Sequence, residues 1–402
     1  MDIFIFLLVM FVVVFAVLAV VGWRRMRNPA GLHPRMRELR TAGGHSEWKL
    51  CIKTMAVLGT GGHTTEMALL LKHLDRRHYL PLVFLYTSDF CLQTIEKIEQ
   101  EKGNAANCEF LKISRSRKVG QPWLSSIFTT AYAIPRAVMH VLRQKPDLLL
   151  INGPGVCIPV CVGAVLLNIL FQHRCAIVFI ESICRVQKLS LTGKILRFVA
   201  TSFFVQWPVP GIPAHAVCLA DDTSCATFNS ESGSAGSEAK ERADSFGQGH
   251  CFVTVGSTNF DKMIRTLDNE ASVFLDSLRK LGVKSATIQI GGTSEIVPEE
   301  TALYKLKDVR VVRILPHSEF LEEVQKASLM VGHAGAGTIL ESLSNGKRLL
   351  VVPNQSLMDN HQRELCEAVA GKYCLSCTED DILSTLQQAH EAFKKVSCAL
   401  PP

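Results

Sequence analysis

The stretch KTMAVLGTGGH, residues 53–63, decides the fold together with a second stretch of the same design, SLMVGHAGAGT at residues 328–338. In each, a short apolar run typical of a buried strand passes into a glycine-rich turn and then into a helical pattern. Such a turn presents backbone N–H groups and a helix N-terminus, which together bind anions. Two of them in separate halves of one chain predict two α/β domains that hold a ligand, a diphosphate, between them. We therefore expect an enzyme.

Short apolar runs recur along both halves of the chain and alternate with helical patterns. Near-continuous apolar character, rather than strict alternation, is typical of parallel strands that are covered on both faces. Strands that alternate with helices predict a doubly wound α/β domain in each half. The strands expected in the first half are Lys53–Leu58, Leu80–Tyr86, Glu109–Ile113, Asp147–Ile151, Ala176–Ile180 and Phe203–Gln206. Those expected in the second half are Cys251–Val255, Ala286–Ile290, Val309–Ile314, Leu329–Val331 and Arg348–Val352.

The chain begins with an apolar stretch, Ile3–Val21, that contains no charged or polar residue. At about 1.5 Å per residue, a helix of this length just spans the hydrocarbon core of a bilayer. Trp23 and a cluster of arginines that begins at Arg24 follow it, so the positive-inside rule places the rest of the chain in the cytosol. A cleaved signal peptide is the alternative, but the chain begins with Asp2 after the initiator and lacks an A-x-A site. We expect a membrane anchor.

Composition changes mark the other boundaries. Between Asp221 and Gly249, Ser, Gly, Ala and Glu replace the β-branched residues, which is typical of a flexible linker. The expected organisation is an anchor at 1–23, a basic juxtamembrane segment at 24–50, a first α/β domain at 51–220, the linker at 221–249 and a second α/β domain at 250–402. A further apolar run, Val156–Phe171, is short for a membrane span; a core helix is one interpretation, and a helix that dips into the membrane surface is the other.

Charge and cysteine content narrow the class of protein. The net charge of +6 over 402 residues suits an anionic membrane surface or an anionic substrate. No basic stripe interleaved with aromatic residues is present, which argues against nucleic acid as a partner. The fourteen cysteines are scattered along the chain and are expected to fill cores as small apolar side chains in a cytosolic body.

The first glycine turn carries the first set of candidate site residues. Gly61 and Gly62 let the backbone approach a ligand, and Thr64 or Thr65 is expected to cap the helix that begins there. His63 stands at the tip of the turn, beside the anion site; a catalytic or phosphate-contacting role and a purely structural hydrogen bond are both open. Thr64 occupies the third glycine position of G-x-G-x-x-G, which argues against a dinucleotide cofactor.

Three further segments of the first half carry polar candidates. Asn152-Gly153-Pro154-Gly155 ends a buried strand, at the edge where open parallel sheets bind ligands. Glu181 ends the next strand and Arg185 follows it; a carboxylate there suits a general base or a hydroxyl binder, and it equally suits a helix cap or a salt bridge. The basic loop that contains Arg117 is either solvated surface or a contact for a diphosphate or lipid headgroups.

The second glycine turn runs from His333 to Glu341. Gly335 and Gly337 clear space at a helix N-terminus, and Thr338 supplies a hydroxyl group. Glu341 lies one turn into the helix, where it can accept hydrogen bonds from a ribose. This combination predicts a site for a nucleoside diphosphate.

Two other loops of the second half add small or polar residues. Gly256-Ser257-Thr258 is a small-residue turn after a strand, and Asp359-Asn360-His361-Gln362 offers donors and acceptors that suit sugar hydroxyls. The chain contains no D-x-D pair, no H-E-x-x-H and no Cys/His set with metal-ligand spacing. We therefore expect a metal-independent mechanism and no cofactor.

Taken together and in this order, the motifs resemble those of a known family. The anchor, GTGGHTTE (59–66), SRSR (114–117), NGPG (152–155), ESICRV (181–186) and FVQWP (204–208) resemble the membrane-anchored subunit of the eukaryotic enzyme that adds the second N-acetylglucosamine (GlcNAc) to dolichyl-diphosphate-GlcNAc. FVTVGSTNFD (252–261), IQIGG (288–292), GHAGAGTILE (332–341) and DNHQREL (359–365) resemble its catalytic, donor-binding subunit. The resemblance covers nearly everything from about Lys53 to Gly371 except the linker, so the chain resembles a natural fusion of the two subunits.

The resemblance extends to the bacterial GlcNAc transferase that makes lipid II, and it implies a GT-B fold, with two facing Rossmann-like domains. It implies an inverting transfer from UDP-GlcNAc to the 4-hydroxyl of dolichyl-diphosphate-GlcNAc, at the cytosolic face of the endoplasmic reticulum membrane. Membrane lipid is a partner in this interpretation, and a complex with other early enzymes of lipid-linked oligosaccharide assembly is open. The region near Leu315 matches only loosely, so the residues that recognise uracil stay unassigned.

The candidate residues then divide into three sets. His63 is the first candidate for the catalytic base and Glu181 the second. The acceptor-binding candidates are Gly61, Gly62, Thr64, Arg117, Asn152, Gly153, Gly155 and Arg185. The donor-binding candidates are Gly256, Ser257, Thr258, Gly291, His333, Gly335, Gly337, Thr338, Glu341, Asn360, His361 and Gln362.

Two alternatives to a transferase stay open at this stage. A UDP-GlcNAc 2-epimerase has the same two-domain architecture and donor motifs, but it needs neither lipid nor anchor. A non-catalytic, membrane-tethered scaffold for glycosylation enzymes is the other alternative, and the two intact glycine turns argue against it.

Overall fold

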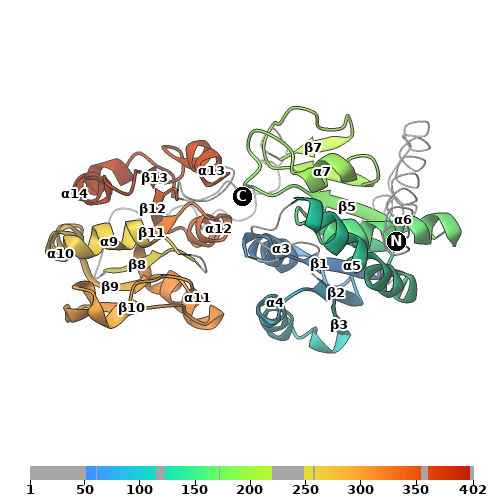
Figure 1. Cartoon of the computed structure of the whole chain (residues 1–402), viewed down its shortest axis with the longest axis horizontal. Coiled ribbons are helices and arrows are strands. Elements are labelled where there is room, and N and C mark those ends of the chain that lie inside the picture. The colour runs from blue at the N-terminus through green and yellow to red at the C-terminus, as the bar shows by residue number, and fades with distance from the viewer. Residues whose placement is uncertain are drawn as a thin grey trace. The chain divides into compact units, whose positions relative to one another are not determined.

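The structure, a computed structural model, describes residues 51–59, 61–114, 123–171, 173–219, 249–256, 259–354 and 361–398. These residues form two compact units, which divide between Asp221 and Asp222. Each unit is a parallel sheet with helices on both faces (Figure 1). The expected anchor at 3–21 and the linker residues 221–248 lie outside the described residues. Among the helices that are described, none is both long and apolar enough to cross a membrane.

The first unit is built on a seven-stranded sheet in which all neighbouring strands are parallel. Its order is β3-β2-β1-β4-β5-β6-β7, so the strand order reverses between β1 and β4. The strands form where Val, Ile, Leu and Phe predominate, because these side chains suit a pleated surface covered on both faces. Their bounds are β1 Thr54–Leu58, β2 Leu82–Tyr86, β3 Cys108–Lys112, β4 Leu148–Asn152, β5 Ala176–Ile180, β6 Ser202–Val205 and β7 Ala216–Cys218.

Two buried cores, one on each face of this sheet, hold its helices in place. Met55 and Val57 of β1 belong to the core under α5, α6 and α7, whereas Ala56 and Leu58 belong to the core under α3 and α4. This division follows from the alternation of side chains along a strand. The helices are α3 Gly62–His73, α4 Asp89–Glu101, α5 Trp123–Gln144, α6 Cys157–Leu170 and α7 Leu191–Leu196, with a 3-10 helix at Ala105–Asn107.

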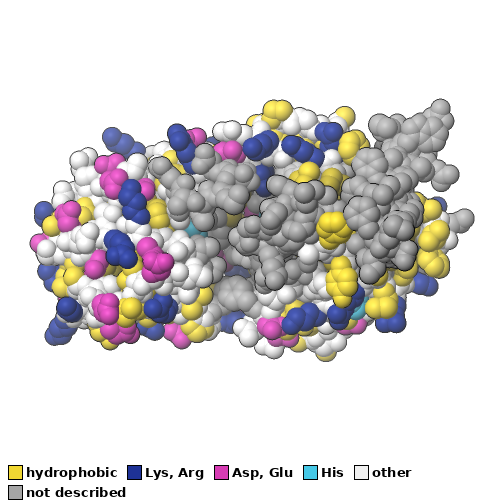
Figure 2. Space-filling view, in the orientation of Figure 1, with side chains coloured by type: hydrophobic (Ala, Val, Ile, Leu, Met, Phe, Trp, Pro, Cys, Tyr) yellow, Lys and Arg dark blue, Asp and Glu magenta, His cyan; other side chains and the backbone are white. Residues whose placement is uncertain are grey.

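The apolar run Val156–Phe171 forms the core helix α6. Most of its side chains are buried, and Asn168 is accommodated because its side chain exchanges two hydrogen bonds with the backbone of Cys175. Its last turn reaches the surface: Leu170 is 65% exposed and Phe171 is 58% exposed. Hydrophobic side chains also reach the surface elsewhere on this unit, as Figure 2 shows. The core-helix interpretation therefore holds for the body of α6, and contact of its apolar tip with a membrane surface stays open.

The second unit repeats the design with a six-stranded parallel sheet. Its order is β10-β9-β8-β11-β12-β13, with the reversal between β8 and β11. The strands are β8 Gly249–Thr254, β9 Val283–Gln289, β10 Val309–Val312, β11 Ala327–His333, β12 Arg348–Val352 and β13 Leu375–Ser376. The helices are α9 Asp261–Asn269, α10 Ala271–Lys280, α11 His317–Lys326, α12 Ala336–Ser344, α13 His361–Val369 and α14 Ile382–Phe393, with 3-10 helices at Pro298–Glu300 and Leu303–Lys305.

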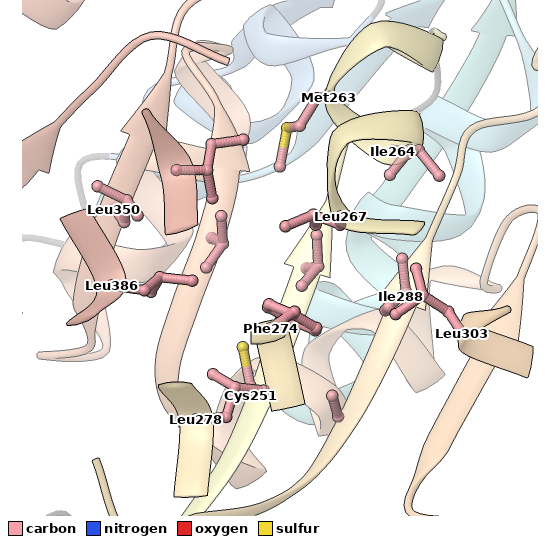
Figure 3. Close-up of a cluster of buried hydrophobic side chains, with 14 of the residues drawn as sticks. Cys251, Met263, Ile264, Leu267, Phe274, Leu278, Ile288, Leu303, Leu350 and Leu386 are labelled. Atoms are coloured by element: carbon pink, nitrogen blue, oxygen red, sulfur yellow. The ribbon is translucent and has the colours of Figure 1, made fainter. Parts of the chain in front are cut away.

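The core of the second unit lies between one face of this sheet and helices α9, α10 and α14 (Figure 3). Phe274 of α10 is fully buried among strand and helix side chains, and truncation of such a residue costs about 3–5 kcal/mol. The fully buried side chains labelled in the view are Cys251, Met263, Ile264, Leu267, Phe274, Leu278, Ile288, Leu303, Leu350 and Leu386. This packing gives the strands of the second unit a rigid base for the turns at their carboxyl ends.

The strands expected from the apolar runs are all present, and the doubly wound α/β prediction is confirmed for both units. Ala176–Ile180 and Arg348–Val352 have the expected bounds, whereas β9 begins three residues before Ala286, at Val283. The sequence did not predict the edge strands β7 and β13. They have only three and two residues, which is short for a strand.

Candidate active site

The glycine turns of both units lie where the strand order reverses. The carboxyl ends of parallel strands share one edge of the sheet, and the turns beside the reversal are where such sheets bind ligands. In the first unit, β1 leads into Gly61 and Gly62 and the neighbouring β4 leads into Gly153. In the second unit, β8 leads into Gly256 and the neighbouring β11 leads into Gly335. The topology thus pairs two candidate turns in each unit.

The two turns of the first unit approach so closely that only glycine fits at the contact. A Cβ atom on Gly59 would lie 2.8 Å from Pro154 Cγ and 2.8 Å from His63 Cβ. Gly61 has a φ of +62° and is the N-cap residue of α3. The expected threonine cap is wrong: the Thr64 hydroxyl lies inside the helix and donates to the Gly59 carbonyl oxygen at 2.7 Å. No described side chain caps α3, so among the described residues its first N–H groups have no side-chain acceptor.

The imidazole ring of His63 lies over Gly153, at the end of β4. A Cβ atom on Gly153 would come within 2.7 Å of His63 Cε1, and Gly153 has a φ of +62°. On its other side, His63 Nδ1 is 3.3 Å from Glu66 Oε2, one helical turn further along α3. The His63 side chain is 31% exposed. His63 is therefore held by two neighbours and still accessible to a ligand.

Glu66 gathers hydrogen bonds from two other strand ends, and the sequence did not single it out. Its Oε1 accepts from Ser182 Oγ at 2.7 Å and from the N–H of Ile183 at 3.2 Å. Its Oε2 accepts from Asn152 Nδ2 at 3.3 Å and lies beside His63 Nδ1. Apart from His63, these partners are 86 or more residues away in the sequence. The only local signal is that Glu66 ends the motif GTGGHTTE, and this does not reveal which residues it binds.

Asn152 ends β4 and is 3% exposed. Its Nδ2 donates to the backbone oxygen of His63 at 2.7 Å as well as to Glu66. Its Oδ1 is buried and has no hydrogen-bond partner among the described residues. An unpaired buried acceptor is costly, so a donor from a bound molecule suits this position. Gly155, in the same turn, is exposed, and Arg185 is half-buried in the turn after β5.

Glu181, the second catalytic candidate, points into the protein and is 1% exposed. Its Oε1 accepts from the N–H of Ser182 at 3.1 Å, and its Oε2 accepts from the N–H of Ser190 at 2.9 Å. Ser190 is the N-cap residue of α7, and the absence of a side chain at Gly193 leaves room for the carboxylate. Burial raises the pKa of Glu181, although the bonds from Ser190 and Ser182 oppose that shift. This geometry favours the helix-cap interpretation of Glu181.

His333, at the end of β11, packs against glycines of the second unit as His63 does in the first. A Cβ atom on Gly256 would lie 2.7 Å from His333 Cε1, and one on Gly335 would lie 2.8 Å from the same atom. The hydroxyl of Thr338 is 3.5 Å from His333 Nδ1. Burial lowers the pKa of His333 to about 4, although its hydrogen bond to the Thr254 backbone acts in the opposite direction. The ring is therefore neutral at pH 7.

Gln289 joins the turns of three strands and is a second residue that the sequence did not single out. Its Nε2 donates to the carbonyl oxygen of Gly256 at 2.8 Å, and its Oε1 accepts from the N–H of Leu315 at 3.1 Å. Gln289 is 3% exposed. A polar residue between two isoleucines just before a glycine pair, in IQIGG, is the signal that would have found it. It fixes the turn after β8 relative to the turn after β10.

The remaining donor candidates lie at the same edge of the second sheet. Gly291 follows β9 with a φ of +92°. Gly337 and Glu341 lie on α12 and are half-buried. The Gln362 side chain accepts from the N–H of Asn354 at 3.2 Å, which ties α13 to the turn after β12. Arg117, Ser257, Thr258, Asn360 and the side chain of His361 lie outside the described residues.

No group of three or more His, Cys, Asp and Glu side chains with metal-binding geometry occurs in the part of the chain that the structure describes. Contrary to the expectation that the cysteines show no metal-ligand spacing, Cys374 and Cys377 form a C-x-x-C pair, but burial raises the pKa of both thiols to about 12. A thiolate is the form that binds metals or reacts, so the pair behaves as part of the core.

The fold is that of the two-domain GT-B glycosyltransferases. MurG of Acinetobacter baumannii superimposes with a TM-score of 0.52 at 18% identity, over 85% of this chain and 90% of that one. A UDP-N-acetylglucosamine 2-epimerase superimposes with a TM-score of 0.52 at 16% identity, over 88% of this chain and 91% of that one. At these identities the likeness establishes the fold and leaves the reaction open.

Two family descriptions match successive parts of the chain: "Oligosaccharide biosynthesis protein Alg14 like" at residues 54–210 and "Glycosyltransferase family 28 C-terminal domain" at residues 250–396. The UDP-N-acetylglucosamine transferase subunit ALG14 of Mus musculus is 45% identical over 168 residues, which are 39% of this chain and 76% of that protein. The human subunit of the same name is 40% identical over 167 residues, with the same two shares. The chain belongs to the Alg14 family and joins that domain to a family 28 glycosyltransferase domain, which confirms the predicted fusion.

Proposed function

We propose that this chain transfers GlcNAc from UDP-GlcNAc to the 4-hydroxyl of the GlcNAc on dolichyl diphosphate, with inversion to a β1,4 link. One observation carries the proposal: an Alg14-like unit and a family 28 glycosyltransferase unit occur in one chain, each with a glycine turn where its strand order reverses. The relatives' name, a UDP-N-acetylglucosamine transferase subunit, supports the choice of donor. The lipid acceptor, the step and the link rest on the resemblance of the sequence motifs.

The second unit is the donor site in this proposal. The N-terminus of α12, with Gly335, Gly337 and Thr338, takes the diphosphate of UDP, and the turn at Gly256 closes on it. Backbone N–H groups and the helix dipole stabilise the charge that develops on the leaving UDP, which a metal would otherwise do. In this proposal Glu341 accepts hydrogen bonds from the ribose, and Gln362 binds hydroxyls of the donor sugar.

The first unit is the acceptor site, and His63 is its base. Inversion requires that a base remove the proton of the acceptor hydroxyl as its oxygen attacks the anomeric carbon of GlcNAc. His63 is 31% exposed at the N-terminus of α3, which no described side chain caps, whereas Glu181 is buried and accepts from the N–H of Ser190, the N-cap residue of α7. The orphaned Asn152 Oδ1 supplies an acceptor for a hydroxyl or amide N–H of the acceptor sugar.

The domains and their location follow from the same proposal. Residues 1–23 anchor the chain in the endoplasmic reticulum membrane, the basic segment at 24–50 lies at the anionic surface, and both units face the cytosol. Residues 51–220 serve the lipid-linked acceptor, 250–402 serve UDP-GlcNAc, and 221–249 join them. Other early enzymes of lipid-linked oligosaccharide assembly are the protein partners to test.

The test uses the purified full chain in detergent, with UDP-GlcNAc, a short-prenyl diphosphate-GlcNAc and EDTA. We expect one GlcNAc added per acceptor and one UDP released, with the new link cleaved by a β-specific hexosaminidase. Product that forms only after a divalent ion is restored would contradict the metal-free step. Conversion of UDP-GlcNAc without any acceptor would favour a 2-epimerase, which has the same fold. If the chain shows no turnover and no UDP binding, the non-catalytic scaffold is the alternative that remains.

A further inference from the structure

The hydrogen bonds of Glu66 assign the role of its two carboxylate oxygens. Each carboxylate oxygen faces a group that can only donate: Oε1 faces the N–H of Ile183, and Oε2 faces Nδ2 of Asn152. The amide nitrogen of Asn152 is fixed at that position because the same atom also donates to the backbone oxygen of His63 at 2.7 Å. Both oxygens of Glu66 therefore accept hydrogen bonds, a pattern that an ionised carboxylate satisfies in full.

This arrangement also selects one tautomer of His63. Nδ1 lies 3.3 Å from Glu66 Oε2, and against an ionised oxygen it is stable only as an N–H donor. In neutral imidazole the second nitrogen, Nε2, then carries the free lone pair. Nε2 makes no hydrogen bond to any residue that the structure describes, and the side chain is 31% exposed. The atom that is able to take a proton is thus the atom left free.

We infer that Glu66 is the positioning residue of the reaction: it holds His63 as the Nδ1–H tautomer, so that Nε2 is the atom that receives the acceptor's proton. This inference rests on the proposed function. As the acceptor O4 bonds to C1 of the donor GlcNAc, the O4–H proton passes to His63 Nε2. The C1–O bond to the diphosphate breaks, and its electron pair leaves with UDP. The imidazolium that results has its positive charge beside the Glu66 carboxylate.

A glutamine at position 66 has the same shape and cannot reproduce this pattern. If its oxygen faces Ile183, its amide group opposes the Asn152 donor and offers a hydrogen to His63 Nδ1, which selects the wrong tautomer. If it is turned round, its amide group opposes the N–H of Ile183. Glu66→Gln is therefore expected to reduce kcat by about 10- to 100-fold, part of the 10²–10⁴ that a general base contributes, with KM for both substrates within about threefold.

The first experiment is a kinetic cycle on the full chain with UDP-GlcNAc and the short-prenyl acceptor. The variants are Glu66→Gln, His63→Ala and the double variant, and Glu101→Gln is the matched control: an exposed carboxylate of the same unit at the end of α4. If Glu66 acts through His63, the double variant is as slow as His63→Ala within about threefold. Losses that multiply in the double variant would overturn the inference, as would a Glu66→Gln enzyme as fast as Glu101→Gln.

The second experiment observes the tautomer directly and does not need a folded variant at position 66. In the wild-type full chain labelled with ¹⁵N-histidine, the His63 signals are identified by their loss in His63→Gln. We expect a protonated-type shift at Nδ1 and an unprotonated-type shift at Nε2 in the neutral ring. The opposite pattern would contradict the positioning role, whatever the kinetics show. If the tautomer is as expected but the wild type makes no product, the proposed function fails while the Glu66–His63 arrangement stands.

Discussion

Replacement of Gly335 by alanine tests whether the second glycine turn is shaped by His333. Gly335 has an ordinary φ of −80°, so alanine meets no backbone strain there. Its Cβ would, however, lie 2.8 Å from Cε1 of His333, an atom that is also close to the Cβ position of Gly256. Because the ring is buried and would have to move to make room, we expect an overpacking cost of about 1–3 kcal/mol and a loss of UDP affinity of about tenfold or more.

Two other glycines of the same unit separate overlap from backbone strain. Gly371 has a φ of +75° and open space around its Cβ position, so Gly371→Ala costs about 1 kcal/mol of strain and leaves UDP affinity within about twofold. Gly256 has a φ of +71° and also meets His333 at 2.7 Å. Gly256→Ala therefore combines both costs, about 2–4 kcal/mol.

The assay needs a probe in the second unit, because the four tryptophans all precede residue 208. Hydrogen exchange of peptides from β8 and β11, read by mass spectrometry, measures the stability of that unit, and calorimetry measures UDP binding. His333→Ala removes the ring, so in that background Gly335→Ala should cost less than about 1 kcal/mol. An equal cost of Gly335→Ala with and without His333 would refute the reasoning.

Three further outcomes follow from the structure. Burial lowers the pKa of His333 to about 4 from 6.5, so between these values the unfolded chain binds a proton that the folded chain does not. The free energy of unfolding of the second unit should therefore fall by about 2 kcal/mol between pH 7 and pH 5. His333→Asn should lose that share of the pH dependence. Gly153→Ala places a Cβ 2.7 Å from the His63 ring, whereas Gly103 has a similar φ of +70° with open space around its Cβ position. Gly153→Ala should lower kcat at least tenfold, and Gly103→Ala should leave it within about twofold. Equal kcat values for the two variants would contradict the packing argument. Glu181→Gln should destabilise the first unit by about 1–3 kcal/mol, because one of the two backbone N–H donors loses its acceptor. Its kcat should stay within about threefold of the wild-type value. A hundredfold lower kcat in a folded variant would restore Glu181 as the base.

The sheets could be predicted from the sequence because their strands are buried on both faces. A run such as Ala176–Ile180 is apolar at every position, so neither its place nor its bounds depend on a distant partner. β7 and β13 were not predicted, because strands of three and two residues are too short to show a pattern and depend on pairing with the strand beside them.

The candidate site was predictable as far as it depends on turns, and not where it depends on side-chain direction. Gly61 and Gly335 lie at strand-to-helix turns, which an apolar run followed by glycines predicts. Glu181 also stands at a strand end, but whether its carboxylate faces a ligand or the helix after it depends on the space left by Gly193. Glu66 looks like an ordinary helical residue, because its partners come from β4 and the turn after β5, far along the chain.

The packing of a histidine ring over a glycine of the neighbouring turn, at His63 over Gly153 and at His333 over Gly256, has an entropic consequence. It fixes each turn to the adjacent strand before any ligand arrives. To fix one residue's backbone costs about 1–2 kcal/mol, so ordering a four-residue turn on binding would cost about 4–8 kcal/mol. Since the turns at 152–155 and 333–337 are already packed against these rings, their contacts with a diphosphate can appear as affinity rather than be offset by a loss of conformational entropy.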